Sequence, residues 1–146
     1  MKFQKITILL MYAGCLPFIF CSVSLILGFQ ILPYLGDITK ILQFYTLVIA
    51  SFMAGTHWGQ HLIVEDKSLY YLPGFSNLVA VFIWFAAILM PIRWFIFSSI
   101  LVFILLLIID YNMAQKKLFS KSYFRVRLIV TTIVIIALLN SIIAVS

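Results

Sequence analysis

Three ionisable side chains recur at every fourth position in the apolar stretch SFMAGTHWGQHLIVED, which spans residues 51–66. They are His57, His61 and Glu65. At about 100° per residue they form one stripe along a helix. Histidines at positions i and i+4 can bind a divalent metal ion. No ligand of defined geometry on a second helix completes such a site, and the acid is far from the first histidine. We therefore predict no metal site, with His57 and His61 as weak candidates only.

Further polar side chains lie near the ends of later apolar stretches. Asp110 ends one stretch, and Arg125 and Arg127 open the next, with Thr131 one turn beyond Arg127. Ionisable groups inside a membrane are costly and are usually paired. We expect Asp110 to accept the guanidinium fork of Arg127 or Arg125. In the simpler interpretation, Arg125 and Arg127 are only anchors at the membrane surface, and Asp110 is an interfacial residue.

Three further interpretations concern His57 and the residues around it. His57 either joins this polar cluster or donates one hydrogen bond to a backbone carbonyl and does nothing else. Trp58 is a candidate wall for a quinone or lipid pocket. Ser51, Gly55 and Gly59 form a separate face of small residues, which lets helix backbones approach closely in membranes. We predict helix packing at this face, within the chain rather than between copies.

Catalytic motifs are missing from the sequence. It contains no recognisable Ser-His-Asp or Cys-His nucleophile, no Gly-rich phosphate loop and no CxxC. The two cysteines, Cys15 and Cys21, are about 9 Å apart along a helix, which is too far for a disulfide. The sequence thus gives no support for an enzymatic activity, and we predict a non-enzymatic protein without a cofactor.

The elements that must position these residues are membrane-spanning helices. Hydrophobic residues make up 65% of the 146 residues, and charged residues only 10%. Soluble domains have about 45–50% and about 25% respectively, so lipid must be the solvent of this chain. A helical span needs about 20 apolar residues. We predict an all-α integral membrane protein, a single domain over 1–146, with five spans: 6–29, 40–64, 73–92, 93–110 and 126–145. Strands are not expected, because an isolated strand cannot satisfy its backbone in lipid.

The distribution of lysine and arginine predicts the orientation of these spans. With five spans, eight of the ten basic residues fall on the side of the N-terminus, and the other two are Lys40 and Arg93. Basic residues concentrate on the cytoplasmic side of membranes, which favours an N-in, C-out arrangement. The net charge of +6 is then explained by this bias. We accordingly expect the lipid bilayer as a partner, and no nucleic acid.

Several motifs together resemble the transmembrane-protein-sixty-nine-like family, small multi-span membrane proteins grouped as a domain of unknown function. The motifs are YAGCLPF, FYTLVIASF, ASFMAGTHWG, LLLIIDYNMAQKK and SYFRVRLIVT, and they cover nearly the whole chain. The family pattern points to these positions of this sequence: Ser51, Phe52, Gly55, His57, Trp58, Gly59, Asp110, Tyr123, Arg127 and Thr131. Ala54 and Ser122 depart from it, where the family shows glycine and tryptophan, and the pattern does not include His61.

The resemblance implies a location and a role, but no reaction. Its members lie in bacterial inner membranes, with relatives in mitochondria, so we expect a multi-pass protein of the bacterial inner membrane. Our leading hypothesis is a protein that binds or supports a membrane protein partner or complex. The alternative is a small-molecule binder or transporter, for a quinone, lipid, proton or ion. It would use a polar cluster in the cytoplasmic half of the bundle, formed by His57, Trp58, Asp110, Tyr123, Arg127 and Thr131.

Overall fold

The computed structural model describes residues 2–63, 67–118 and 120–145. Within these ranges the chain forms α-helices joined by short connections, with one small hairpin and one turn of 3-10 helix. The elements are α1 (Lys2–Ala13), α2 (Leu16–Ile26), β1 (Ile31–Leu32), β2 (Gly36–Asp37), α3 (Ile38–Ile63), η1 (Lys67–Leu69), α4 (Leu72–Leu89), α5 (Ile92–Gln115) and α6 (Lys121–Val145).

Five membrane spans are present in the described residues, which confirms the predicted fold class. The expected span 6–29 is built from two helices, α1 and α2, while α3, α4, α5 and α6 form one span each. Two helices extend beyond the expected limits: α5 runs past position 110 to Gln115, and α6 begins at Lys121, before position 126. Hydropathy marks only the part of a helix that lies in lipid, whereas helical hydrogen bonding continues into polar ends.

The break in the first span lies at Gly14 and Cys15. The amide of Cys15 donates to the carbonyl of Tyr12 at 3.0 Å, which tightens the last turn of α1. Pro17 then provides no amide proton, and its ring excludes the carbonyl four residues before it. The hydroxyl of Tyr45, from α3, donates to the carbonyl of Gly14 at 2.9 Å. A side chain of a neighbouring helix thus satisfies backbone that the break leaves open.

A short hairpin joins α2 to α3, which corrects the expectation that the chain has no strands. Ile31 pairs with Asp37 and Leu32 with Gly36 in antiparallel register. Tyr34 and Gly36 have positive φ angles, of 68° and 86°. The hairpin lies between two spans, not within one, so its unpaired backbone groups do not have to be satisfied inside lipid.

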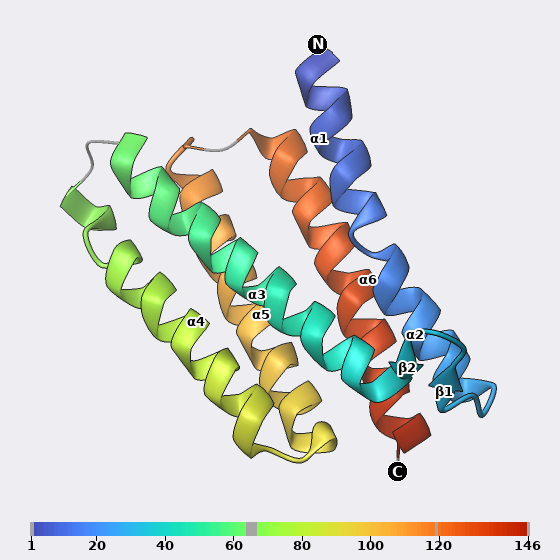
Figure 1. Cartoon of the computed structure of the whole chain (residues 1–146). Coiled ribbons are helices and arrows are strands. Elements are labelled where there is room, and N and C mark those ends of the chain that lie inside the picture. The colour runs from blue at the N-terminus through green and yellow to red at the C-terminus, as the bar shows by residue number, and fades with distance from the viewer. Residues whose placement is uncertain (1, 64–66, 119, 146) are drawn as a thin grey trace.

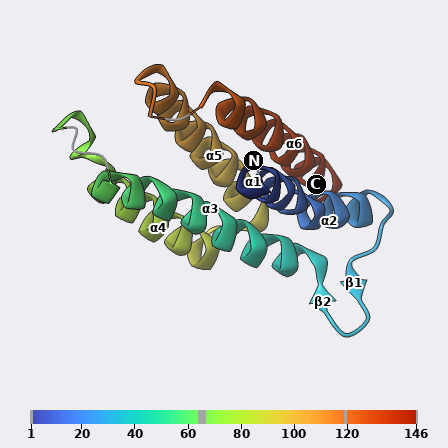
Figure 2. The same cartoon turned by 90° about the horizontal axis from the view of Figure 1, so that it is seen from above.

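Two helix pairs and α2 make up the bundle (Figures 1 and 2). Helices α3 and α4 form one antiparallel pair, α5 and α6 another, and α2 packs against both α6 and α3. Between them lies a core of fully buried side chains, with Phe18, Leu42, Leu106 and Leu138 among its members. Large apolar side chains also cover the outside of every span, as expected for surfaces in lipid.

The two termini lie at opposite ends of the bundle (Figure 1). The α3–α4 and α5–α6 connections are at the N-terminal end, whereas the hairpin and the α4–α5 turn are at the other end. This arrangement fits five crossings. Which end faces the cytoplasm stays a prediction of the charge distribution.

Candidate functional site

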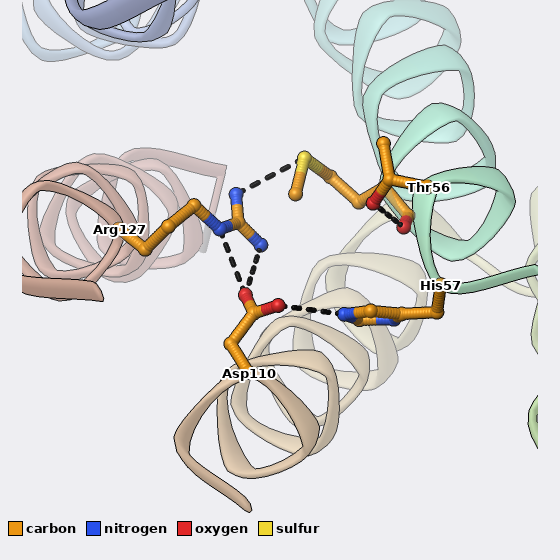
Figure 3. Close-up of polar contacts among 5 residues, drawn as sticks. Thr56, His57, Asp110 and Arg127 are labelled. Carbon is orange, nitrogen blue, oxygen red and sulfur yellow. Dashed lines mark hydrogen bonds and ion pairs between the residues drawn. The ribbon is translucent and has the colours of Figure 1, made fainter. Parts of the chain in front are cut away.

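Three of the predicted site residues meet in the bundle interior and form a buried triad of His57, Asp110 and Arg127 (Figure 3). Nε2 of His57 lies 2.7 Å from Oδ1 of Asp110. On the other side, Nε and Nη2 of Arg127 lie 2.8 and 2.7 Å from Oδ2 of Asp110. The exposed fractions of the three residues are 0%, 1% and 6%. The predicted pair of Asp110 with Arg127 is therefore present, while Arg125 is exposed.

Helical periodicity explains why the three side chains converge. His57 is the last of a buried row on α3 that also contains Thr46, Ala50 and Ala54. Asp110 lies on the buried face of α5, and Arg127 begins the buried row of α6. Spacings of three and four residues keep each row on one side of its helix. Antiparallel packing of α5 and α6 then brings the end of one row beside the start of the other.

Both carboxylate oxygens of Asp110 have a partner in the triad. Arg127 does not reach both oxygens as the expected fork, because His57 occupies Oδ1 and leaves Oδ2 for both guanidinium nitrogens. With an ionised carboxylate, the Nε2–H of His57 is the donor. Nδ1 of His57 is then buried without a hydrogen-bond partner among the described residues. Arg127 and Asp110 form a buried ion pair inside the triad.

A mainly apolar cavity of about 320 Å³, here called the lateral pocket, lies beside the triad. It is bounded by α1, α2, α3, α5 and α6, and Arg127 forms part of its wall. Its lining residues are Thr7, Leu10, Met11, Gly14, Phe18, Ile49, Phe52, Met53, Thr56, Phe103, Tyr123, Arg127, Val130, Thr131 and Val134. Leu10 and Phe52 are 64% and 66% exposed, so the pocket is flanked by the lipid-facing surface between α1 and α3.

The polar residues predicted on α6 line this pocket together. Tyr123, Arg127 and Thr131 are four residues apart, so they form one row along the helix and along the pocket wall. Trp58 does not join them, because it is 43% exposed and is not among the lining residues. The structure thus brings five of the six predicted cluster residues to the triad or the pocket.

The small-residue face of α3 is not a packing seam within the chain. A side-chain carbon added at Gly55 or Gly59 would meet no other atom within 4 Å, and Ser51 is only partly buried. The row that contains Ala50, Ala54 and His57 makes the internal contacts instead. The two rows are offset by one residue, which is about 100° around the helix, and the sequence has small residues in both.

Of the two histidines in the stripe, only His57 belongs to the triad. The ring of His61 packs edge-on against Tyr70, with centroids 5.4 Å apart. In the described part of the chain no three His, Cys, Asp or Glu side chains are grouped to hold a metal ion. Glu65 lies outside the described residues.

Sequence reasoning missed two residues of α3 that complete the site. The Sδ of Met53 lies 3.1 Å from Nη1 of Arg127, and the hydroxyl of Thr56 donates to the carbonyl of Met53 at 2.7 Å (Figure 3). Their signal is periodicity: Ile49, Phe52, Met53 and Thr56 follow helical spacing and all line the lateral pocket.

The fold and the site define a class, that of multi-pass, all-α membrane proteins with a charged pair buried between their helices. Within this class the chain belongs to the family described as "Protein of unknown function (DUF3429)", whose model matches residues 3–143. Comparison with curated proteins found no match, and comparison with solved structures found none.

Proposed function

We propose that this protein is a non-enzymatic membrane protein that binds a hydrophobic small molecule in the lateral pocket. The observation that carries the proposal is a cavity of about 320 Å³ at the side of a five-span bundle, walled by apolar side chains and by the polar row Tyr123, Arg127 and Thr131. Ligand pockets have volumes of about 300–1,000 Å³ and combine apolar walls with a few polar groups. The lateral pocket meets both criteria.

The dimensions of the pocket suit an elongated molecule. Its wall on α6 extends from Tyr123 to Val134, which is roughly 16 Å at the helical rise. Tyr123 and Arg127 lie toward one end of this wall and Val134 lies at the other, with Thr131 between them. A ligand with one polar end and an apolar body would match this division. The exposed neighbours Leu10 and Phe52 provide a route of entry from the bilayer.

Support of a membrane protein partner stays a prediction. It rests on the resemblance to the transmembrane-protein-sixty-nine-like family, as does placement in the bacterial inner membrane. No contact of the described residues favours a particular partner, whereas the pocket favours a ligand. We therefore place the small-molecule binder ahead of the partner hypothesis.

Filling the pocket provides the test. Val134 is 5% exposed and lines the pocket, so Val134→Phe should occupy its apolar end. The matched control is Val48→Phe, because Val48 is 61% exposed on α3 and does not line the pocket. The measurement is saturable binding of an environment-sensitive hydrophobic fluorophore to the purified protein. We expect binding by the wild type and the control, and at least tenfold weaker binding by Val134→Phe. Equal binding by all three proteins would refute the proposal.

A further inference from the structure

We propose that the lateral pocket selects a ligand whose polar end is an uncharged hydrogen-bond acceptor, of the ketone or quinone carbonyl type, and that Arg127 and Thr131 donate to it. This inference rests on the proposed function and specifies the ligand class for the same site. It follows from three features of the pocket: the donors that remain, their spacing, and the charge balance around them.

The first feature is a pair of donors without a strong acceptor. Nη1 of Arg127 has the thioether of Met53 as its acceptor, at 3.1 Å, and thioether sulfur is a weak acceptor. Thr131 is 5% exposed and lines the pocket, and its hydroxyl makes no hydrogen bond within the part of the chain that the structure describes. By contrast, the neighbouring Thr132 donates to the carbonyl of Leu128 at 2.8 Å. A stronger acceptor on a ligand in the pocket could therefore accept from both donors.

The second feature is position. Arg127 and Thr131 are four residues apart on α6, so their side chains are neighbours on one face of the helix. Both belong to the wall of the same cavity. One acceptor group lying against this face can therefore contact both donors, with the apolar body of the ligand directed toward Val134.

The third feature is charge. Two nitrogens of Arg127 bind Oδ2 of Asp110 at 2.7–2.8 Å, so its positive charge is already compensated. A carboxylate or phosphate in the pocket would add an unpaired negative charge at a site of low dielectric constant, which is unfavourable. A carbonyl oxygen accepts the same hydrogen bonds without adding charge. The charge balance therefore favours the neutral acceptor over an anion.

The experiment compares three competitors of equal chain length for the fluorophore bound in the pocket: a long-chain methyl ketone, the matching fatty acid and the matching alkane. We expect the ketone to compete best. Thr131→Val removes one donor without changing the shape of the side chain, and it should weaken the ketone about two- to tenfold, as for one neutral hydrogen bond. The alkane should be unaffected. Thr132→Val is the control and should change neither competitor.

The outcomes separate this inference from the proposed function. If the alkane competes as well as the ketone, or if Thr131→Val leaves the ketone unchanged, the carbonyl assignment is wrong although the pocket still binds. If the fatty acid competes best, the pocket prefers an anion and the inference is overturned. If the fluorophore does not bind, or binds Val134→Phe equally, the proposed function itself fails.

Discussion

Asp110 holds two helices at once, because each of its oxygens accepts from a different one. His57 on α3 takes Oδ1, and Arg127 on α6 takes Oδ2. The consequences of losing each partner differ. Removal of the imidazole loses one hydrogen bond to a charged group, about 1.5–3 kcal/mol. Removal of the carboxylate leaves a guanidinium buried without its counter-charge, which is the larger penalty.

Asp110→Leu is accordingly expected to lower the free energy of unfolding by about 3–5 kcal/mol. The double variant Asp110→Leu, Arg127→Met should be much less destabilised than the sum of the two single variants, since no unpaired charge remains. The free energy of unfolding of the two single variants and the double variant is measured by titration with a denaturing detergent. If the two single losses simply add, the ion pair contributes no coupling and this interpretation of the triad is wrong.

At this scale the sequence predicted which side chains meet better than how they meet. The residue types and depths of His57, Asp110 and Arg127 pointed to one cluster, because ionisable groups in lipid must be paired. The sharing of Oδ2 by two guanidinium nitrogens was not predictable, since it depends on which oxygen the histidine reaches. Met53 was missed because a methionine in an apolar run carries no sign of the cation beside it.

The start of α3 shows how one residue fixes an element. Asp37 is the last residue of β2, and its Oδ1 accepts from the amide of Thr39 at 2.8 Å and from its hydroxyl at 2.7 Å. This is the arrangement of a helix N-cap, which satisfies an amide that has no partner within the helix. The hydrogen bond from the Thr39 hydroxyl lowers the pKa of Asp37.

Asp37→Ala is expected to destabilise the chain by about 1 kcal/mol at neutral pH, through loss of the cap. Asp37→Asn keeps an acceptor and should cost less. Because the pKa of Asp37 is lower in the folded chain, its contribution is present above the unfolded pKa and is lost as the pH falls through the folded pKa. Unfolding curves between neutral and acidic pH check this. An equal acid-dependent loss in Asp37→Asn would contradict the assignment.

At the scale of elements, the sequence predicted the number of spans correctly. It did not predict the break within the first span. Hydropathy gives the length of apolar chain, and five such lengths are present. It does not show that the first span is divided at Gly14, just before Pro17, a residue type that commonly kinks helices. It also does not tell which of two small-residue faces of α3 packs inward. The neighbouring helices decide that, and they contact Ala50 and Ala54 rather than Gly55.

The arrangement of the whole molecule creates the lateral pocket. Its walls come from helices far apart in the sequence, from Thr7 on α1 to Val134 on α6. No local pattern reports such a cavity, because it depends on how far α1 lies from α3 across the face of α6. The sequence therefore carried no sign of this cavity, and the partner hypothesis came from the family resemblance alone.

The orientation in the membrane is a prediction about the whole molecule. If the N-terminus is cytoplasmic, the α3–α4 connection is inside and the α4–α5 turn is outside (Figure 1). Lys67 and Arg93 are exposed at these two places, and the native Cys15 and Cys21 are buried. A membrane-impermeant thiol reagent should therefore label Arg93→Cys in intact cells, and Lys67→Cys only after permeabilisation. The reverse pattern would show that the charge rule gives the wrong orientation.

The measurement that tests the central claim most directly is native mass spectrometry of the protein after gentle extraction in mild detergent. We expect the wild type and Val48→Phe to carry the same extra mass, that of one hydrophobic molecule, and Val134→Phe to lack it. A wild type that is bare, or one whose extra mass is equally retained by Val134→Phe, would contradict the claim that the lateral pocket is a binding site.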